Sequence, residues 1–359
     1  MPRDADIVVI GAGIVGAATA RALAGYAGTV LLLEQFELGH TRGSSHGTSR
    51  IFRLNYPDAR FVRMALGADG EWRRLESECG ERLIDRAGCL DLGPVARETE
   101  RALAACGARY ETLSADEVRA RWPLRLDEGQ TAVYQPDGGV TRADRAHAAL
   151  VAGAVAGGVE LREQTPVRAL ALDRGEVRVA TDGAELTARA VVVTAGAWSP
   201  RLLGTAGIDL AVVPTRETVV YLDVPSAGEV PPLIDYDARP AAGEGGIDRV
   251  GQSAYALAAP GVGLKAGLHH SGPVTDPDDE PTPTAAIADW VSEWAVRRYV
   301  DVGERLGAET CLYTNTADEG FVLERHGRVV IGSACSGHGF KFAPVVGRTL
   351  AALALEAAD

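Results

Sequence analysis

The chain has 359 residues, and its 36 basic and 49 acidic side chains give a net charge of −13 at pH 7. This length suggests one to three domains, and 46% hydrophobic with 24% charged residues is typical of a globular chain, not a disordered or fibrous one. The acidic balance disfavours a nucleic-acid partner, because phosphate binding depends on basic surface. No window reaches the roughly 18 apolar residues of a membrane span, so no membrane partner is expected.

The chain ends and the cysteines favour a cytoplasmic protein. Acidic residues precede the first apolar run, whereas a signal peptide begins with positively charged residues. The last residues carry no peroxisomal tripeptide. The five cysteines are scattered without a CxxC pair, which suggests a reducing compartment and predicts no metal site. They are Cys79, Cys89, Cys106, Cys311 and Cys335.

The first forty residues have the order of a dinucleotide-binding unit. An apolar run at 7–10 reads as a buried strand, GAGIVG follows at 11–16, a small-residue helix is expected over 17–23, and a second strand over 30–33 ends in Glu34. A glycine-rich turn in some other α/β protein is the alternative. The flanking strands and the acid favour the dinucleotide interpretation.

Each residue of this motif has a separate physical task. Gly11 permits the tight turn, Gly13 lets a pyrophosphate approach the backbone, and Gly16 allows close helix–strand packing. The pyrophosphate would bind at the helix N-terminus, where free N–H groups favour anions. Glu34 can accept hydrogen bonds from a ribose, which makes NADP the least suitable dinucleotide, but the motif does not separate FAD from NAD.

Further apolar strands near the C-terminus predict an interrupted nucleotide-binding domain. We expect helices over 71–81, 97–105, about 287–299 and from 344 onward, and strands over 159–162, 167–172 and 177–180, forming a meander, and over 190–194 and 329–332. The nucleotide-binding domain is expected to comprise 1–80, 145–212 and 320–359. Residues 81–144 and 213–319 would then form the substrate-facing catalytic domain.

Five further segments resemble the monomeric sarcosine oxidase family of flavoprotein amine oxidases, which includes N-methyltryptophan and pipecolate oxidases and belongs to the D-amino acid oxidase superfamily. They are GSSHGTSRIFR (43–53), TAGAW (194–198), GLKAGLH (263–269), CLYTNTADE (311–319) and SGHGFK (336–341). With the N-terminal motif they span nearly the whole chain in the family's order. The resemblance implies an α/β fold in which a Rossmann-type FAD-binding domain is interrupted by a catalytic domain with a mixed, largely antiparallel sheet.

The resemblance assigns Cys311 to a covalent bond with FAD, because the family's C-x-Y-T cysteine forms a thioether to the 8α carbon of the flavin. A buried core cysteine is the alternative, and it is the expectation for the other four. Val167, at the start of an expected strand, is placed among the cofactor-binding residues.

The loop at 44–53 is rich in charge and small polar residues. From chemistry alone, Arg50 and Arg53 form a cationic site suited to a carboxylate. The resemblance implies that Arg53 binds the substrate carboxylate, that His46 and Arg50 are catalytic residues lining the flavin ring, and that Ser44 and Ser45 contact the cofactor. A solvated basic loop is the alternative.

The chain has only two lysines, Lys265 and Lys341, among its 36 basic residues, which suggests positions where a compact ammonium is required. Lys341 precedes a helix and adds positive charge to that loop. It could stabilise a reduced flavin or pair with the substrate carboxylate, and the resemblance implies mainly the second role, shared with Arg53. Lys265 matches the catalytic residue that promotes reaction with oxygen, which a fixed cation would assist.

The remaining site residues come from the resemblance. Gly337, His338 and Gly339 would contact the cofactor through the backbone. His269 as a catalytic residue, with Tyr255 and Tyr313, would surround the substrate amine, where tyrosines can supply cation–π contact. The alternative for each of these three residues is an ordinary side chain of the core.

These assignments predict an FAD-dependent oxidase of a secondary amine or cyclic imino acid. A hydride equivalent would pass from the C–N unit of a small amino acid to flavin and then to O2, giving an imine and hydrogen peroxide, in a monomeric enzyme. The alternatives are a biosynthetic tailoring flavoenzyme of the same fold, an NAD-dependent dehydrogenase, and a non-catalytic nucleotide-sensing module.

Overall fold

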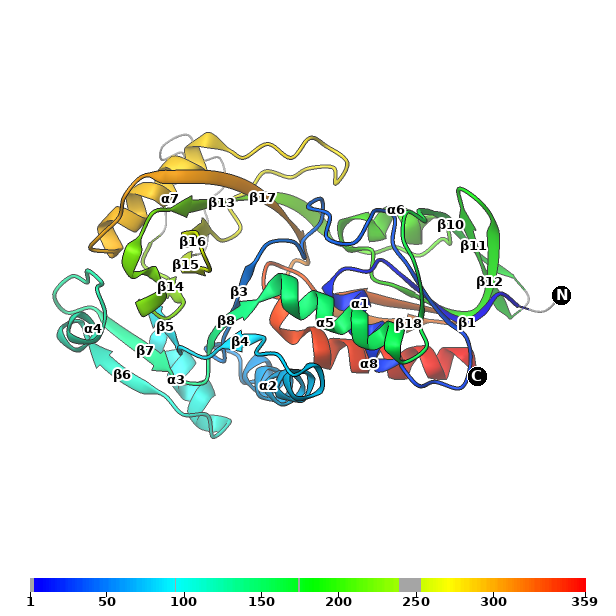
Figure 1. Ribbon diagram of the computed structural model, residues 1–359, viewed down its shortest axis with the longest axis horizontal. Coiled ribbons are helices and arrows are strands. Elements are labelled where there is room, and N and C mark those ends of the chain that lie inside the picture. Colours follow the sequence, from blue (N-terminus) through cyan, green and yellow to red (C-terminus); the bar gives the residue numbers. More distant parts are fainter. Residues whose placement is uncertain (1–2, 94, 174, 239–252) are drawn as a thin grey trace.

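The computed structural model describes residues 3–93, 95–173, 175–238 and 253–359. These residues form two large sheets, a small third sheet and the helices packed around them (Figure 1). The strands are β1 (Ala5–Ile10), β2 (Val30–Leu33), β3 (Ser49–Phe52), β4 (Ile84–Asp85), β5 (Cys89–Leu92), β6 (Glu111–Ser114), β7 (Thr131–Gln135), β8 (Gly139–Arg142), β9 (Glu160–Arg162), β10 (Val167–Asp173), β11 (Glu176–Thr181), β12 (Glu185–Val193), β13 (Val213–Leu222), β14 (Leu233–Asp235), β15 (Ala254–Ala259), β16 (Gly263–Leu268), β17 (Arg305–Asn315), β18 (Val322–His326) and β19 (Val329–Ser333). The α-helices are α1 (Ile14–Ala22), α2 (Ala59–Cys79), α3 (Ala96–Ala105), α4 (Ala115–Arg121), α5 (Ala143–Ala156), α6 (Ser199–Gly204), α7 (Ala285–Arg298) and α8 (Ala343–Ala358).

The first sheet is built around the parallel strands β19, β12, β1, β2 and β9. Its central strands are buried on both faces, which explains their continuous apolar runs. Helix α1 packs against α5 and α8 along one face, and α6 lies at the other (Figure 1). This is the Rossmann-type part of the predicted fold.

Two local predictions for this part of the chain were wrong. The strand expected at 159–162 does not join a meander, because β9 pairs in parallel with β2, and the antiparallel meander is β10–β11–β12. The helix expected at 71–81 begins twelve residues earlier, where the Asp58 carboxylate accepts a hydrogen bond from the backbone N–H of Arg60 and caps α2. Gly80, in the left-handed conformation, ends this helix.

The second sheet has the order β17-β13-β16-β15-β14-β5-β7-β6 and is antiparallel except for the parallel pair β14–β5. Helix α7 packs against one face, where Leu264, Ala266 and Val220 join Trp290 and Trp294 in a common core. The opposite face is therefore the one available for a site. This arrangement is the mixed, largely antiparallel sheet of the prediction.

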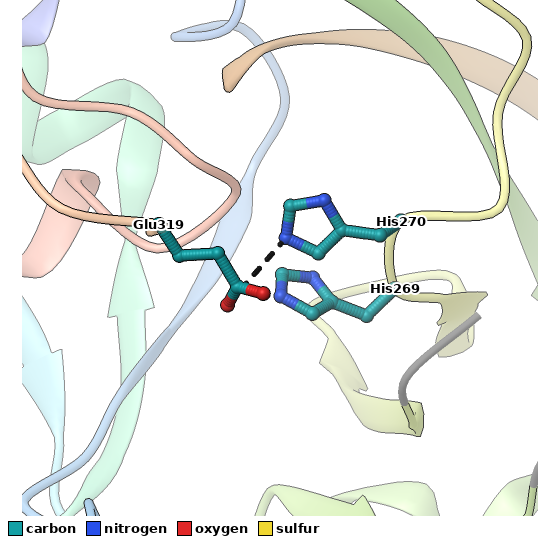
Figure 2. A group of neighbouring side chains, drawn as sticks. All are labelled: His269, His270 and Glu319. Atoms are coloured by element: carbon teal, nitrogen blue, oxygen red, sulfur yellow. Dashed lines mark ion pairs between the residues drawn. The ribbon is translucent and has the colours of Figure 1, made fainter. Parts of the chain in front are cut away.

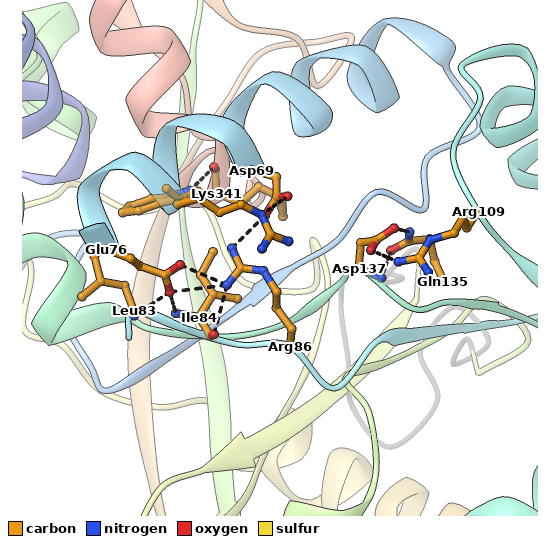
Figure 3. Close-up of polar contacts among 11 residues, drawn as sticks. Asp69, Glu76, Leu83, Ile84, Arg86, Arg109, Gln135, Asp137 and Lys341 are labelled. Carbon is orange, nitrogen blue, oxygen red and sulfur yellow. Dashed lines mark hydrogen bonds and ion pairs between the residues drawn. The ribbon is translucent and has the colours of Figure 1, made fainter. Parts of the chain in front are cut away.

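Helix α2 connects the small sheet β3-β8-β4 to the loop before α8. Arg86 forms ion pairs with Asp69 at 2.9 Å and Glu76 at 3.1 Å on α2 (Figure 3). The indole N–H of Trp72, also on α2, donates to the carbonyl oxygen of Lys341 at 2.8 Å. Trp72 is fully buried, so this bond fixes the backbone of Lys341. None of the described helices combines the length and apolar character needed to cross a membrane.

Candidate active site

A cavity of about 290 Å³ lies where the β1–α1 turn, the loop at 43–50, β17 and the segment 332–340 meet. Its lining contains most of the residues predicted to bind the cofactor. They are Gly11, Gly13, Glu34, Ser44, Ser45, His46, Arg50, Val167, Cys311, Gly337 and Gly339. Segments more than 300 residues apart in the chain therefore form one elongated site.

The glycine motif shapes the end of this cavity at the first sheet. Gly11 has φ +93°, and a Cβ at Gly16 would lie 1.8 Å from the carbonyl oxygen of Gly11, so Gly16 packs the helix against the strand and does not line the cavity. The Glu34 carboxylate accepts a hydrogen bond from the backbone N–H of Ala12 at 2.8 Å. The Ser45 hydroxyl accepts one from Ile14 N–H at the start of α1, at 2.9 Å. A helix N-terminus and a fixed carboxylate are the groups that a dinucleotide requires.

Strand register brings the second sheet's predicted residues to one face. Lys265 lies opposite Tyr221 on β13, and Cys311 lies opposite Glu217. Because Tyr221 and Glu217 are separated by an even number of residues, their side chains and partners share the face opposite α7. Tyr313, two residues beyond Cys311, is on the same face.

Lys265 lies buried beside the loop at 43–50, and it is 6% exposed. A Cβ at Gly47 would lie 3.5 Å from Lys265 Nζ and 3.3 Å from Arg50 Nη1, so the two cations are close. Burial, with the charge of Arg50, lowers the pKa of Lys265 to about 7. This ammonium is therefore a group whose charge responds to any anion placed next to it.

The loop arginines have separate positions, contrary to the expectation of one combined carboxylate site. Arg50 donates to the carbonyl oxygens of Ser44 at 2.9 Å and His46 at 2.6 Å, so its guanidinium holds the loop together. Burial lowers the pKa of His46 to about 4, which keeps the imidazole neutral, and its Nε2 has no hydrogen-bond partner among the described residues. A buried polar atom without a partner at the cavity wall fits a bound cofactor that supplies one.

Arg53 faces a second cluster, formed with residues that the sequence analysis did not identify. Its Nη1 donates to the carbonyl oxygen of Asn55 at 2.7 Å and to the Tyr236 hydroxyl at 3.0 Å, and its guanidinium lies 4.3 Å from the centre of the Tyr56 ring. Tyr56 follows Arg53 in the same loop. Tyr236 directly follows β14 and completes the cluster.

Lys341 contacts the same tyrosine through its hydroxyl group. Its Nζ donates to the Tyr56 hydroxyl at 2.9 Å and to the carbonyl oxygen of His338 at 2.8 Å. Burial, with the charge of Arg53, holds the pKa of Lys341 well below its usual range. An anion bound between Arg53 and Lys341 would offset that loss of charge, so this pair is suited to a carboxylate.

His269, Tyr255 and Tyr313 form an aromatic wall next to the glycine segment. His269 Nδ1 lies 3.3 Å from the Tyr313 hydroxyl, and a Cβ at Gly337 would lie 2.2 Å from the Tyr313 ring and 2.5 Å from His269. Gly337 has φ +74°, so glycine is required there for both conformation and space. Tyr255 lies across Gly267 on the same sheet face.

His270 and Glu319 lie next to this wall. Figure 2 shows the His270 ring directed at the Glu319 carboxylate, 3.8 Å away, with His269 beside them. Both His270, at φ +58°, and Glu319, at φ +56°, have left-handed backbones. Burial, with the neighbouring His270, lowers the pKa of His269 well below its usual value.

Several predicted residues are not part of the cavity lining, and they are Arg53, Tyr255, Lys265, His269, His338 and Lys341. The His338 ring bonds the Tyr56 hydroxyl at 3.2 Å and packs among Phe61, Phe321 and Phe342, while its flanking glycines line the cavity. The four cysteines other than Cys311 were expected to be core residues, and among them only Cys89 is buried. Cys79 is exposed, Cys106 is partly buried, and Cys335 lines the cavity near Cys311.

The model of the FAD dependent oxidoreductase family matches residues 6–353. The chain belongs to this family. Peroxisomal sarcosine oxidase of Mus musculus is 35% identical to it, over 98% of this chain and 92% of the relative. Monomeric sarcosine oxidase of Arthrobacter sp. is 30% identical, over 98% and 93%. The solved structure of NikD, an unusual amino acid oxidase essential for nikkomycin biosynthesis, has a TM-score of 0.86 and 27% identity, and the match covers 98% of this chain and 94% of NikD.

As a member of the FAD-dependent oxidoreductases, the chain is an enzyme that uses flavin, and the NAD-dependent dehydrogenase alternative is wrong. The cavity residues fit FAD: the α1 N-terminus and Glu34 suit the nucleotide end, and His46 has a ring nitrogen that no described residue hydrogen-bonds. Bound FAD would supply a two-electron acceptor. The protein would supply position, charge and exclusion of water.

Proposed function

We propose that this FAD-dependent oxidoreductase oxidises a secondary amine that carries a carboxylate, an N-methyl or cyclic amino acid, to an imine, with O2 as the final acceptor and hydrogen peroxide as the second product. The convergence of Arg53 and Lys341 on Tyr56 carries this proposal. A buried guanidinium and a buried lysine, which an anion would keep protonated, meet on one tyrosine and form a carboxylate clamp beside an aromatic wall that suits an amine. The names of the sarcosine oxidase relatives support the substrate class.

Each residue group then has a task. Arg53 and Lys341 bind the carboxylate and orient the substrate, while Tyr255, Tyr313 and His269 enclose the amine and exclude water. His46 and Arg50 hold the flavin-binding loop, and Lys265 provides a cation where oxygen must accept charge. His269 stays neutral because burial lowers its pKa, so it can accept a hydrogen bond from the amine.

We also propose the division into an FAD-binding domain (1–80, 145–212 and 320–359) and a catalytic domain (81–144 and 213–319). The two large sheets support it, since β1, β2, β9–β12, β18 and β19 form one and β5–β7 and β13–β17 the other. The free, scattered cysteines support a cytoplasmic location, and the name of the Arthrobacter relative supports a monomer.

A second candidate is a biosynthetic tailoring oxidase that acts on a cyclic amino acid or imine. The structural likeness to NikD, an oxidase of nikkomycin biosynthesis, favours it. The segment from Tyr236 to Ala258 would best separate the candidates, but 239–252 lie outside the described residues.

A peroxide-coupled screen tests the function directly. Sarcosine, N-methyltryptophan, pipecolate, proline and D-amino acids would be offered to the holoenzyme, and we expect peroxide from at least one secondary amine. Bound flavin without peroxide from any amine would instead favour the nucleotide-sensing alternative.

We propose that Cys311 forms the covalent bond to FAD. Its sulfur lies on the cavity wall, 3.9 Å from the carbonyl oxygen of Ser44, and it is partly buried. Acid-precipitated wild-type protein should stay yellow, and Cys311→Ser should release its flavin into the supernatant, measured by absorbance. Cys335→Ser is the matched control, since Cys335 lines the same cavity, and a colourless wild-type pellet would contradict the bond.

A further inference from the structure

Asp91 is a buried carboxylate next to the clamp, and no role has so far been assigned to it. It is 0% exposed, and neither of its oxygens makes a hydrogen bond of normal geometry with the described residues, although the Asn55 side chain lies near enough to lower its pKa. Buried carboxylates are normally hydrogen-bonded, because an isolated buried charge is costly. An acid left in this condition requires an explanation from its surroundings.

Strand register places Asp91 on the site face of the second sheet. On β5, Leu90 and Leu92 join the core under α7, so Asp91 faces the other way. Asp91 lies opposite Ile234, which in turn lies opposite Tyr255. The carboxylate therefore shares a row with a residue of the proposed amine-binding wall.

Arg53 is the positive charge that faces Asp91 most closely. Arg53 Nη1 lies 3.6 Å from Asp91 Oδ2, too far for a hydrogen bond, and the same nitrogen donates to Asn55 and Tyr236. The charged and titratable groups that act on the carboxylate are Arg53, Tyr56, Tyr236 and Cys89, and Lys341 lies beyond them, where its charge acts on Cys89.

Burial raises the pKa of Asp91 to about 7, and the charge of Arg53 opposes this rise. A substrate carboxylate bound to Arg53 would add a second negative charge to the same guanidinium. It would weaken the opposing effect of Arg53 and repel an ionised Asp91, so the protonated form would be favoured in the complex.

We propose that Asp91 is a positioning residue that couples carboxylate capture to proton uptake: an anionic substrate binds Arg53 as a proton from solvent binds the Asp91 carboxylate. The proton neutralises Asp91, so the substrate carboxylate replaces Asp91 as the negative charge next to Arg53. This inference rests on the proposed function, because it requires that Arg53 receives a carboxylate. The coupling predicts that the affinity of the enzyme for a carboxylate falls as pH rises.

Propanoate, a carboxylate without an amine, isolates this coupling from amine ionisation. Calorimetry on the wild-type holoenzyme should show its Kd weakening about tenfold between pH 6 and pH 8, the range over which Asp91 ionises in the free enzyme. Asn mimics protonated Asp, so Asp91→Asn should lose this change and bind about tenfold more tightly than wild type at pH 8. Any change of Kd with pH that comes from Lys341 is common to wild type and Asp91→Asn. The Asp91→Glu variant should retain the wild-type change of Kd with pH.

Proton uptake provides an independent readout. Titrations at pH 7 in two buffers of different ionisation enthalpy should show uptake on propanoate binding by wild type, and less uptake by Asp91→Asn or, if that variant does not fold, Asp91→Ser. Asp289→Asn, an equal charge change at an exposed position on α7, should match wild type. No uptake by wild type, or the wild-type pH dependence in Asp91→Asn, would overturn the proposal. Failure of wild type to bind propanoate at any pH would instead contradict the Arg53–Lys341 clamp of the proposed function.

Discussion

Replacing Arg53 with alanine should lower kcat/KM for an acidic amine substrate by roughly 30- to 1,000-fold, mainly through KM. The expected loss of about 2–4 kcal/mol is typical of removing a charged hydrogen-bond donor from a buried anion. Lys341 remains in the variant, but burial holds its pKa low, so it cannot replace the permanent charge of a guanidinium. Steady-state kinetics with sarcosine or pipecolate would measure the effect.

The decarboxylated amine is the decisive comparison for this variant. It lacks the group that Arg53 binds, so Arg53→Ala should process it as wild type does, whereas a merely misfolded site would lose both substrates. Arg74→Ala is a suitable control, because this arginine is exposed on α2. Equal losses on the acid and on its decarboxylated analogue would argue against a carboxylate clamp.

Replacing Lys265 with methionine should slow the oxygen half-reaction by about 10²- to 10³-fold, the usual cost of removing one preorganised positive group from a developing anion. Methionine has a similar length, so the packing beside Arg50 and Tyr221 should be largely retained. Substrate reduction of the enzyme should change little, because Lys265 is not part of the Arg53–Lys341 clamp. Stopped-flow mixing with substrate without oxygen, and then with oxygen, separates the two steps.

The pH dependence provides a second test of Lys265. Burial lowers its pKa to about 7, so the cation is present below that pH and is lost as pH rises through it. A negative charge next to Lys265 would make its amine hold the proton more tightly, so the rate of the wild-type oxygen reaction should fall only above about pH 7. The Lys265→Met variant should lack this fall. Arg305→Met, at an exposed position on β17, serves as the control. Equal loss in both half-reactions would rule out a specific oxygen role.

The parts of the fold that depend on local sequence could be predicted. Glycines at 11, 13 and 16 between two apolar runs specify a strand, a tight turn and a closely packed helix, and the structure contains them. Pairing between distant strands could not be predicted in the same way. Strand β9 has few residues and no pattern that distinguishes a parallel partner from a meander, so its pairing with β2 depends on tertiary packing.

The candidate site shows the same division. Lys265, Lys341 and Cys311 lie in distinctive segments, and both lysines are buried, which their rarity in the sequence does not show. Asp91 lies in the short run CLDL, where nothing local shows which way an acid faces. Tyr236 is also unremarkable in sequence, and only the β14–β5 pairing and the hydrogen bond from Arg53 reveal its place. An acid in an otherwise apolar strand was the one available signal for Asp91.

Anaerobic mixing of the purified holoenzyme with N-methyl and cyclic amino acids tests the central claim most directly. We expect at least one of them to bleach the visible flavin absorbance without oxygen, and we expect air to restore the colour with formation of hydrogen peroxide. A flavin band that no secondary amino acid can bleach would contradict an amine oxidase built around the Arg53–Lys341 pair.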